Sequence, residues 1–181
     1  MAAIVANFAD PTENLKVLDI APGARVADFG AGSGAYTFAA AALVGREGKV
    51  YAVEVQKELV DTLVSTAIER GFSNIEALWG DLDRVGGSHI AEASIDAVII
   101  SNILFQSEDK RSIAQEALRI LKPGGTALVI DWSGSFRGLG PSAAAVVNAT
   151  QGKSLFIEAG FELVKECNAG AQHWGIIMRK P

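Results

Sequence analysis

The sequence predicts an α/β fold: a doubly wound, mostly parallel seven-stranded sheet with helices on both faces and an antiparallel last strand. Apolar runs alternate with helical patterns along the whole chain. The run Ile95–Ser101 is almost continuously apolar, as expected of a central parallel strand that is covered on both faces. Only the short segment 168–172 separates the last two runs, Phe161–Cys167 and His173–Arg179. That connection is too short for a parallel crossover, so we expect the final strand to be reversed.

The other elements follow from hydrophobic periodicity and from the glycines at their ends. In Lys57–Arg70 the apolar residues recur at helical spacing, and Gly71 stands where a C-terminal cap belongs. The remaining expected strands are Arg25–Phe29, Val50–Val55, Ile75–Trp79 and Thr126–Asp131, and the remaining expected helices are Ala35–Val44, Asp109–Leu121 and a helical region that follows Pro141 and reaches Ala159.

Length, charge and cysteine content narrow the class of protein. A chain of 181 residues fits one domain, 1–181. The net charge of −5 without a basic run disfavours nucleic acid and leaves a small-molecule or protein partner. No apolar run has the length of a membrane span, and the N-terminus lacks a basic signal region, so we expect a cytoplasmic protein. Cys167 is the only cysteine, which excludes an intramolecular disulfide and a multi-cysteine metal site; no metal site is predicted.

A glycine run and a later carboxylate predict a nucleoside site. Gly30, Gly32 and Gly34 follow the first strand, and Glu54 ends the second strand twenty residues after the last glycine. Glycines let the backbone approach a ligand, and a carboxylate at a strand end can accept hydrogen bonds from ribose hydroxyls. Dinucleotide enzymes space their glycines differently, as G-x-G-x-x-G. Asp28 beside the loop disfavours a pyrophosphate and suits an ammonium or sulfonium group.

Together with later motifs in the chain, this run resembles the class I S-adenosylmethionine-dependent methyltransferases over nearly the whole chain. The resemblance implies a Rossmann-like fold, S-adenosylmethionine as cofactor, S-adenosylhomocysteine as product, and methyl transfer to an unidentified acceptor. Two alternatives stay open: an NAD(P)-dependent Rossmann oxidoreductase and a non-catalytic S-adenosylmethionine-binding module. The matching segments are Val26–Gly34, Val50–Glu54, Gly80–Leu82, Ser94–Asn102, Ile120–Trp132 and the final pair of strands.

The resemblance also implies a role for each matching residue. Every one has a structural alternative as well: the glycines as a tight turn, the carboxylates as helix caps, and Asn102 as a partner for backbone groups at a strand end. Asp83 competes with Asp81. The implied cofactor-binding residues are Gly30, Gly32 and Gly34 around the methionine part and ribose, Asp28 at the methionine ammonium, Glu54 at both ribose hydroxyls, Val55 and Leu82 on the faces of the adenine, Asp81 at the adenine amine, and Asn102 beneath the methionine part.

The acceptor side is less defined. The reversed last strand returns His173 to the edge of the sheet where Glu54 and the glycines lie, so His173 is the candidate catalytic base; Asp131 and water are alternative proton acceptors. Trp132 is a candidate lining residue for a substrate pocket, whereas Trp79 is interpreted as core. The segment 1–22 is a candidate cover for the site, and completion by a second subunit would make the protein a homo-oligomer.

Overall fold

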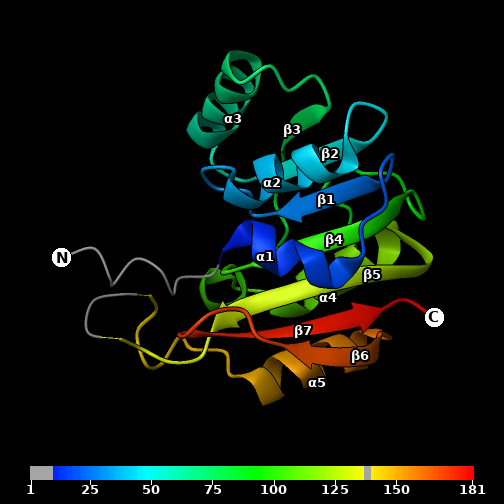
Figure 1. Cartoon of the computed structure of the whole chain (residues 1–181). Coiled ribbons are helices and arrows are strands. Elements are labelled where there is room, and N and C mark those ends of the chain that lie inside the picture. Colours follow the sequence, from blue (N-terminus) through cyan, green and yellow to red (C-terminus); the bar gives the residue numbers. More distant parts are fainter. Residues whose placement is uncertain (1–9, 137–139) are drawn as a thin grey trace.

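The structure, a computed structural model, describes residues 10–136 and 140–181. Its centre is one seven-stranded sheet with the strand order β3-β2-β1-β4-β5-β7-β6 (Figure 1). The strands are β1 Arg25–Phe29, β2 Lys49–Glu54, β3 Ile75–Trp79, β4 Ile95–Ser101, β5 Leu121–Trp132, β6 Glu162–Cys167 and β7 His173–Arg179. The helices are α1 Pro11–Leu15, α2 Ala35–Val44, α3 Lys57–Glu69, α4 Lys110–Ile120 and α5 Ala149–Ala159, with short 3-10 turns η2 Lys16–Leu18 and η3 Leu104–Gln106.

The strand directions confirm the predicted fold class. The neighbours from β3 through β5 pair in parallel. β7 runs antiparallel to both of its neighbours, β5 and β6. Figure 1 shows this reversal, with the β7 arrow opposed to the β5 arrow. His173 begins β7 and pairs with Trp132, the last residue of β5, so the reversal brings both residues to the carboxyl edge of the parallel strands.

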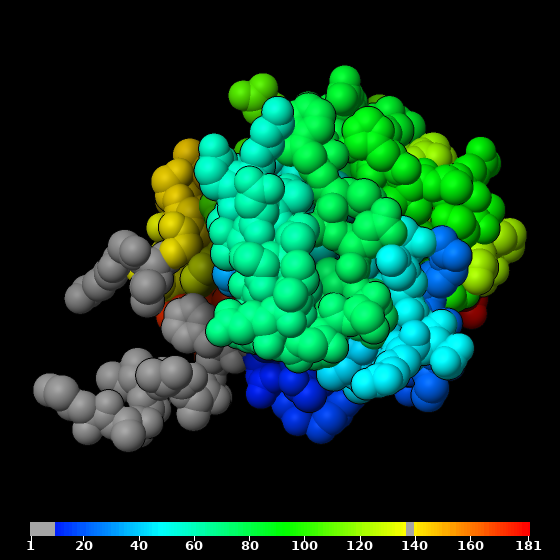
Figure 2. Space-filling view, turned by 90° about the horizontal axis from the view of Figure 1, so that it is seen from above, coloured from blue at the N-terminus to red at the C-terminus, as the bar shows by residue number. Residues whose placement is uncertain are grey.

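Helices cover both faces of the sheet. One face packs against α4 and α5, where Ile113 and Phe156 join Phe29 and Ile100 in a buried cluster. The opposite face packs against α1, α2 and α3. Figure 2 views the molecule from the side of α3 and β3, one of the two edges of the sheet. Among the described residues, no helix has the length and apolar character needed to cross a membrane.

The structure corrects two of the expected elements. The helical region after Pro141 does not extend to Ala159 as one helix, because α5 starts only at Ala149. Asn148 and Gln151 form a capping box there: the Asn148 side chain accepts from the Gln151 amide at 2.9 Å, and the Gln151 side chain accepts from the Asn148 amide at 3.0 Å. Strand β5 begins at Leu121 rather than at Thr126, and its pairing with β4 is irregular between these two residues.

Candidate functional site

A cavity of about 570 Å³ lies at the carboxyl edge of the parallel strands. Such edges are where open α/β sheets bind their ligands. Of the predicted site residues, all but Gly34 line this cavity. The lining therefore includes Asp28, Gly30, Gly32, Glu54, Val55, Asp81, Leu82, Asn102 and His173, together with residues that were not predicted, such as Tyr36 and Gln56.

Glycine stands at these three positions for different structural reasons. All three have a positive φ, which other residues rarely adopt. A Cβ at Gly30 would lie 2.3 Å from the Ile103 side chain, and one at Gly34 would lie 2.6 Å from Phe38. A Cβ at Gly32 would have the Gly30 carbonyl oxygen, at 3.9 Å, as its nearest neighbour. Gly30 and Gly34 therefore leave room for neighbouring side chains, while Gly32 leaves open space beside the cavity.

Glu54 organises the glycine loop. Its Oε2 accepts from the Gly32 amide at 3.0 Å, and its Oε1 accepts from the amides of Val55 and Gln56 at 2.9 Å each. A carboxylate offers roughly four acceptor positions, and these backbone bonds occupy three of them. A ribose with two hydroxyls would therefore share oxygens with these amides or replace one of them.

Asp28 lies buried behind the glycine loop. Burial raises the pKa of its carboxyl to about 6, and the nearby charge of Glu54 adds to this effect. The Thr37 hydroxyl donates to Asp28 at 2.5 Å and partly opposes the shift. At pH 7 the protein therefore holds an ionised carboxylate in a place that resists its charge, and a cationic group beside it would relieve that cost.

The two candidate acids after β3 have different partners. Both oxygens of Asp83 are engaged: Oδ1 accepts from the Ser107 hydroxyl at 2.5 Å and Oδ2 from the Glu108 amide at 3.1 Å. Asp81 accepts from the Asp83 amide at 3.1 Å through Oδ1, and no bond to its Oδ2 is found among the described residues. Asp83 thus fastens the loop, and Asp81 keeps an oxygen available to a ligand.

Asn102 follows β4 in a left-handed conformation, with φ of 59°, which asparagine tolerates better than most residues. Its Oδ1 is buried and has no hydrogen-bond partner among the described residues.

Asp131 supports the loop that follows β4. Its carboxylate accepts from the amides of Leu104 at 2.9 Å and Trp132 at 2.7 Å, and burial raises its pKa to about 6. Asp131 does not line the cavity, so its role as a direct proton acceptor is not supported.

His173 and Trp132 form one wall of the cavity. Their ring centroids lie 4.5 Å apart, with the planes tilted by 39°. His173 is 8% exposed, and burial lowers the pKa of its imidazole, so the ring is neutral at pH 7. A neutral imidazole can accept a proton. The position expected for His173 is therefore confirmed, while its catalytic role stays a prediction.

Tyr36 is a lining residue that was not predicted from the sequence. It lies in the first turn of α2, and its hydroxyl accepts from Asn14 of α1 at 2.8 Å. Burial raises its pKa, so the phenol keeps its proton. Pro11 of α1 also lines the cavity, which brings part of the expected cover 1–22 to the site. Residues 1–9 of that segment lie outside the described residues. No local pattern marks Tyr36, because its role depends on α1 packing against α2.

The charge of the lining is one-sided. It contains four carboxylates, those of Asp28, Glu54, Asp81 and Asp83, and none of the described lining residues is Lys or Arg. The interpretation of Trp79 is also settled. Trp79 is 44% exposed and donates to the Val55 carbonyl at 2.9 Å, so its interpretation as core is wrong.

Fold and site together define an α/β nucleoside-binding domain whose cavity favours a cation. The profile of a methyltransferase-domain family matches residues 20–179 of the chain. The chain therefore belongs to this family, and the expected membership in the class I S-adenosylmethionine-dependent methyltransferases is confirmed.

Individual relatives agree with this assignment. The chain is 34% identical over 107 residues to an arsenite methyltransferase of Aquipseudomonas alcaligenes, covering 57% of this chain and 31% of that protein. It is 26% identical over 121 residues to a demethylmenaquinone methyltransferase of Bacillus velezensis, covering 67% of this chain and 51% of that protein. The crystal structure of an S-adenosylmethionine-dependent methyltransferase from Aquifex aeolicus superposes with a TM-score of 0.87 at 24% identity, covering 96% of this chain and 91% of the other. The chain thus spans a third to a half of the curated relatives.

Proposed function

We propose that this chain transfers the methyl group of S-adenosylmethionine to a small-molecule acceptor. The observation that carries the proposal is the charge of the cavity, with four carboxylates and no Lys or Arg among the described lining residues. S-adenosylmethionine carries a sulfonium and an ammonium, which suit such a lining. The pyrophosphate of NAD(P) would face the same carboxylates without a compensating cation, which disfavours the oxidoreductase alternative.

At the donor end of the cavity, different residues suit different groups of the cofactor. Glu54 would accept from the ribose hydroxyls, and Asp28 would lie nearest the ammonium, where a positive charge offsets the cost of its burial. The open space above Gly32 lets a ligand approach the backbone. Asp81 would accept from the adenine amine, and the exposed Val55 and the buried Leu82 would contact the two faces of the ring.

Bound S-adenosylmethionine supplies an activated methyl group, which leaves sulfur as the acceptor atom forms its new bond. The chain contributes alignment and exclusion of water. Asn102 would use its unpartnered Oδ1 for the methionine part or the acceptor. His173, neutral and beside Trp132, would take the proton that the acceptor releases.

Arsenite is a poor fit for this chain as an acceptor, although one relative is an arsenite methyltransferase. Trivalent arsenic is a soft centre that prefers several thiolates. The chain has one cysteine, Cys167 of β6, and it does not line the cavity. An uncharged organic molecule lying against Trp132 and His173 suits the lining better. The cytoplasmic location and a homo-oligomeric assembly stay predictions.

The test is a transfer assay with methyl-labelled S-adenosylmethionine and separate fractions of small metabolites, lipids, RNA and protein. We expect label in the small-molecule fraction, and its loss in Glu54→Ala. Label only in the protein or RNA fraction would contradict the proposed acceptor class. S-adenosylhomocysteine binding without transfer to any fraction would favour the non-catalytic binding module.

A further inference from the structure

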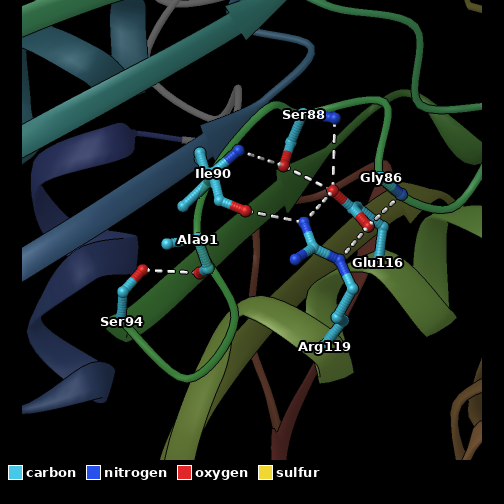
Figure 3. Close-up of polar contacts among 7 residues, drawn as sticks. All are labelled: Gly86, Ser88, Ile90, Ala91, Ser94, Glu116 and Arg119. Atoms are coloured by element: carbon cyan, nitrogen blue, oxygen red, sulfur yellow. Dashed lines mark hydrogen bonds and ion pairs between the residues drawn. The ribbon is translucent and has the colours of Figure 1, made fainter.

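The loop 80–90, which follows β3, is fastened to α4 by a buried ion pair. The chain forms no helix between β3 and β4. Its first residues, Gly80 to Asp83, line the cavity. Its later residues are held by Glu116 and Arg119, which project from α4 toward the loop (Figure 3).

Glu116 is fully buried, and most of its hydrogen bonds leave its own helix. Its Oε2 accepts from the Gly86 amide at 2.6 Å, and its Oε1 accepts from both the amide and the hydroxyl of Ser88, the amide at 3.2 Å. Arg119 donates to the two oxygens at 2.8 Å each and to the Ile90 carbonyl at 2.7 Å. Burial alone would raise the pKa of Glu116, but hydrogen bonds from Arg119, Ser88 and Gly86 lower it, so the carboxylate stays charged.

The fastened part of the loop lies directly against the part that lines the cavity. A Cβ at Gly87 would lie 1.7 Å from the Asp81 carbonyl oxygen, and one at Gly80 would lie 2.5 Å from the Gly87 carbonyl oxygen. The two backbone stretches are thus in contact with no side chain between them. A displacement of Gly86 to Ser88 is transmitted to Asp81 and Leu82, because close-packed interiors pass on such shifts.

A second anchor fixes the same loop from the other side. Asp83 accepts from Ser107 and Glu108, which precede α4. The loop 80–90 is therefore held at two points. One is the pair Ser107 and Glu108 just before α4, and the other is the pair Glu116 and Arg119 within that helix. A pair that only supported its helix would not need a fully buried carboxylate bonded to loop amides.

We propose that Glu116, held by Arg119, is a positioning residue for the methyl donor: it sets the place of Asp81 and Leu82 against the adenosine part of the cofactor. The proposal rests on the proposed function, because it assumes that the adenine lies beside these two residues. Glu116 itself is not in the cavity lining. Its effect on binding passes through the loop, and the methionine part of the cofactor does not depend on it.

The test compares Glu116→Gln and Ser88→Ala with the intact chain. A glutamine presents an NH₂ to one of the loop donors, and Ser88→Ala removes one hydroxyl while keeping the carboxylate. The ligands are S-adenosylhomocysteine and 5′-methylthioadenosine, which lacks the amino-acid part, titrated by calorimetry. We expect Glu116→Gln to weaken both ligands by about tenfold and Ser88→Ala by about threefold, equally for the two ligands. Thermal melts report the folded fraction, so that the dissociation constant refers to folded protein.

Asp96→Asn is the matched control. Asp96 also accepts from a backbone amide, that of Arg25 at 2.8 Å, and from Lys122 at 2.6 Å. It lies near the start of β4, at the end of the parallel strands that is opposite to the cavity. A merely structural Glu116 would lower the melting temperature, as the control does, and leave both dissociation constants unchanged, which would overturn the inference. If Glu116→Gln does not fold, Ser88→Ala decides alone. Failure of the intact chain to bind either ligand would refute the proposed function, and this inference with it.

Discussion

The proposed donor end and the proposed acceptor end of the cavity are built in different ways. At the donor end, Glu54 and the glycine loop form a network of backbone bonds within two neighbouring strand ends. At the acceptor end, Tyr36, Trp132 and His173 come from α2, β5 and β7. The donor end is thus encoded by local motifs, whereas the acceptor end exists only when distant strands pair. Variants at the two ends should therefore separate donor binding from transfer.

The largest effect is expected at Glu54. Glu54→Ala removes the proposed ribose contact and three backbone hydrogen bonds, one from the glycine loop and two from the residues that follow β2. Hydrogen bonds to a charged group contribute about 1.5–3 kcal/mol each, so S-adenosylhomocysteine should bind roughly 100-fold more weakly. Calorimetry measures this. Glu76→Ala, at an exposed glutamate of β3 that pairs with Lys49, is the control and should bind normally. Equal affinities would remove Glu54 from the site.

At His173 we expect the converse result, a loss of transfer with intact binding of the donor. His173→Gln should lower the transfer rate about 100-fold through loss of the base and leave S-adenosylhomocysteine affinity unchanged. Because burial lowers the pKa of His173, the rate of the intact enzyme should stay flat through neutral pH and fall only on the acid side, when the imidazole is protonated. Rate profiles against pH check this, with the exposed His89→Gln as control. An unchanged rate in His173→Gln would assign the proton to water.

Asp28 should show a conflict between stability and binding. Its folded pKa of about 6 is raised above the ordinary 3.8, so its stabilising contribution is complete below pH 3.8 and is lost as the pH rises through 6. At pH 7 the ionised carboxylate destabilises the fold by about 3 kcal/mol, at about 1.4 kcal/mol per pKa unit. Asp28→Asn should therefore raise the free energy of unfolding at pH 7 by up to that amount.

The same substitution should weaken S-adenosylmethionine. In the intact chain the affinity should fall as the pH drops below about 6, where Asp28 becomes protonated, and in Asp28→Asn that dependence should disappear. Denaturant unfolding and calorimetry at pH 5 and pH 7 measure the two effects. Thr37→Val removes the hydroxyl that donates to Asp28 and leaves the Asp28 side chain in place. It therefore tests whether the pKa of Asp28, rather than the shape of its side chain, determines the affinity. A less stable Asp28→Asn would contradict this account of the charge.

The smallest effects are expected at the glycines, where alanine substitutions at Gly32 and Gly34 should differ in their loss of stability. Gly32→Ala should cost about 1 kcal/mol of stability from its positive φ, since its Cβ meets open space. It should weaken S-adenosylhomocysteine severalfold. Gly34→Ala, with a Cβ 2.6 Å from Phe38, should lose more stability than Gly32→Ala. Chemical denaturation and binding measured on both variants check this. Equal stability losses would mean that packing does not distinguish the two positions.

Much of the fold could be predicted, because its signals are local. The apolar run of β4 predicted a central parallel strand, and the short link before His173 predicted the reversed last strand. The start of α5 was not, because the capping box at Asn148 outweighs the helical propensity of the preceding alanines. Propensity is a weak guide where a side chain can satisfy the backbone at a later residue.

The site was predictable to the extent that it consists of strand ends. Parallel strands place their last residues at one edge, so Glu54 and Asn102 could be located from the pattern alone. Tyr36 and Glu116 could not, because both act through contacts between elements far apart in sequence. Trp79 was misjudged because an indole at an edge strand can cover the backbone from outside, bonded here to the Val55 carbonyl.

We propose above all that the acidic cavity binds a cationic methyl donor. Parallel calorimetric titrations of the intact chain with S-adenosylmethionine, S-adenosylhomocysteine and NAD at pH 7 test it most directly. The account predicts one site for both S-adenosyl ligands, lost in Glu54→Ala, and no measurable binding of NAD. Binding of NAD with no response to either S-adenosyl ligand would contradict it.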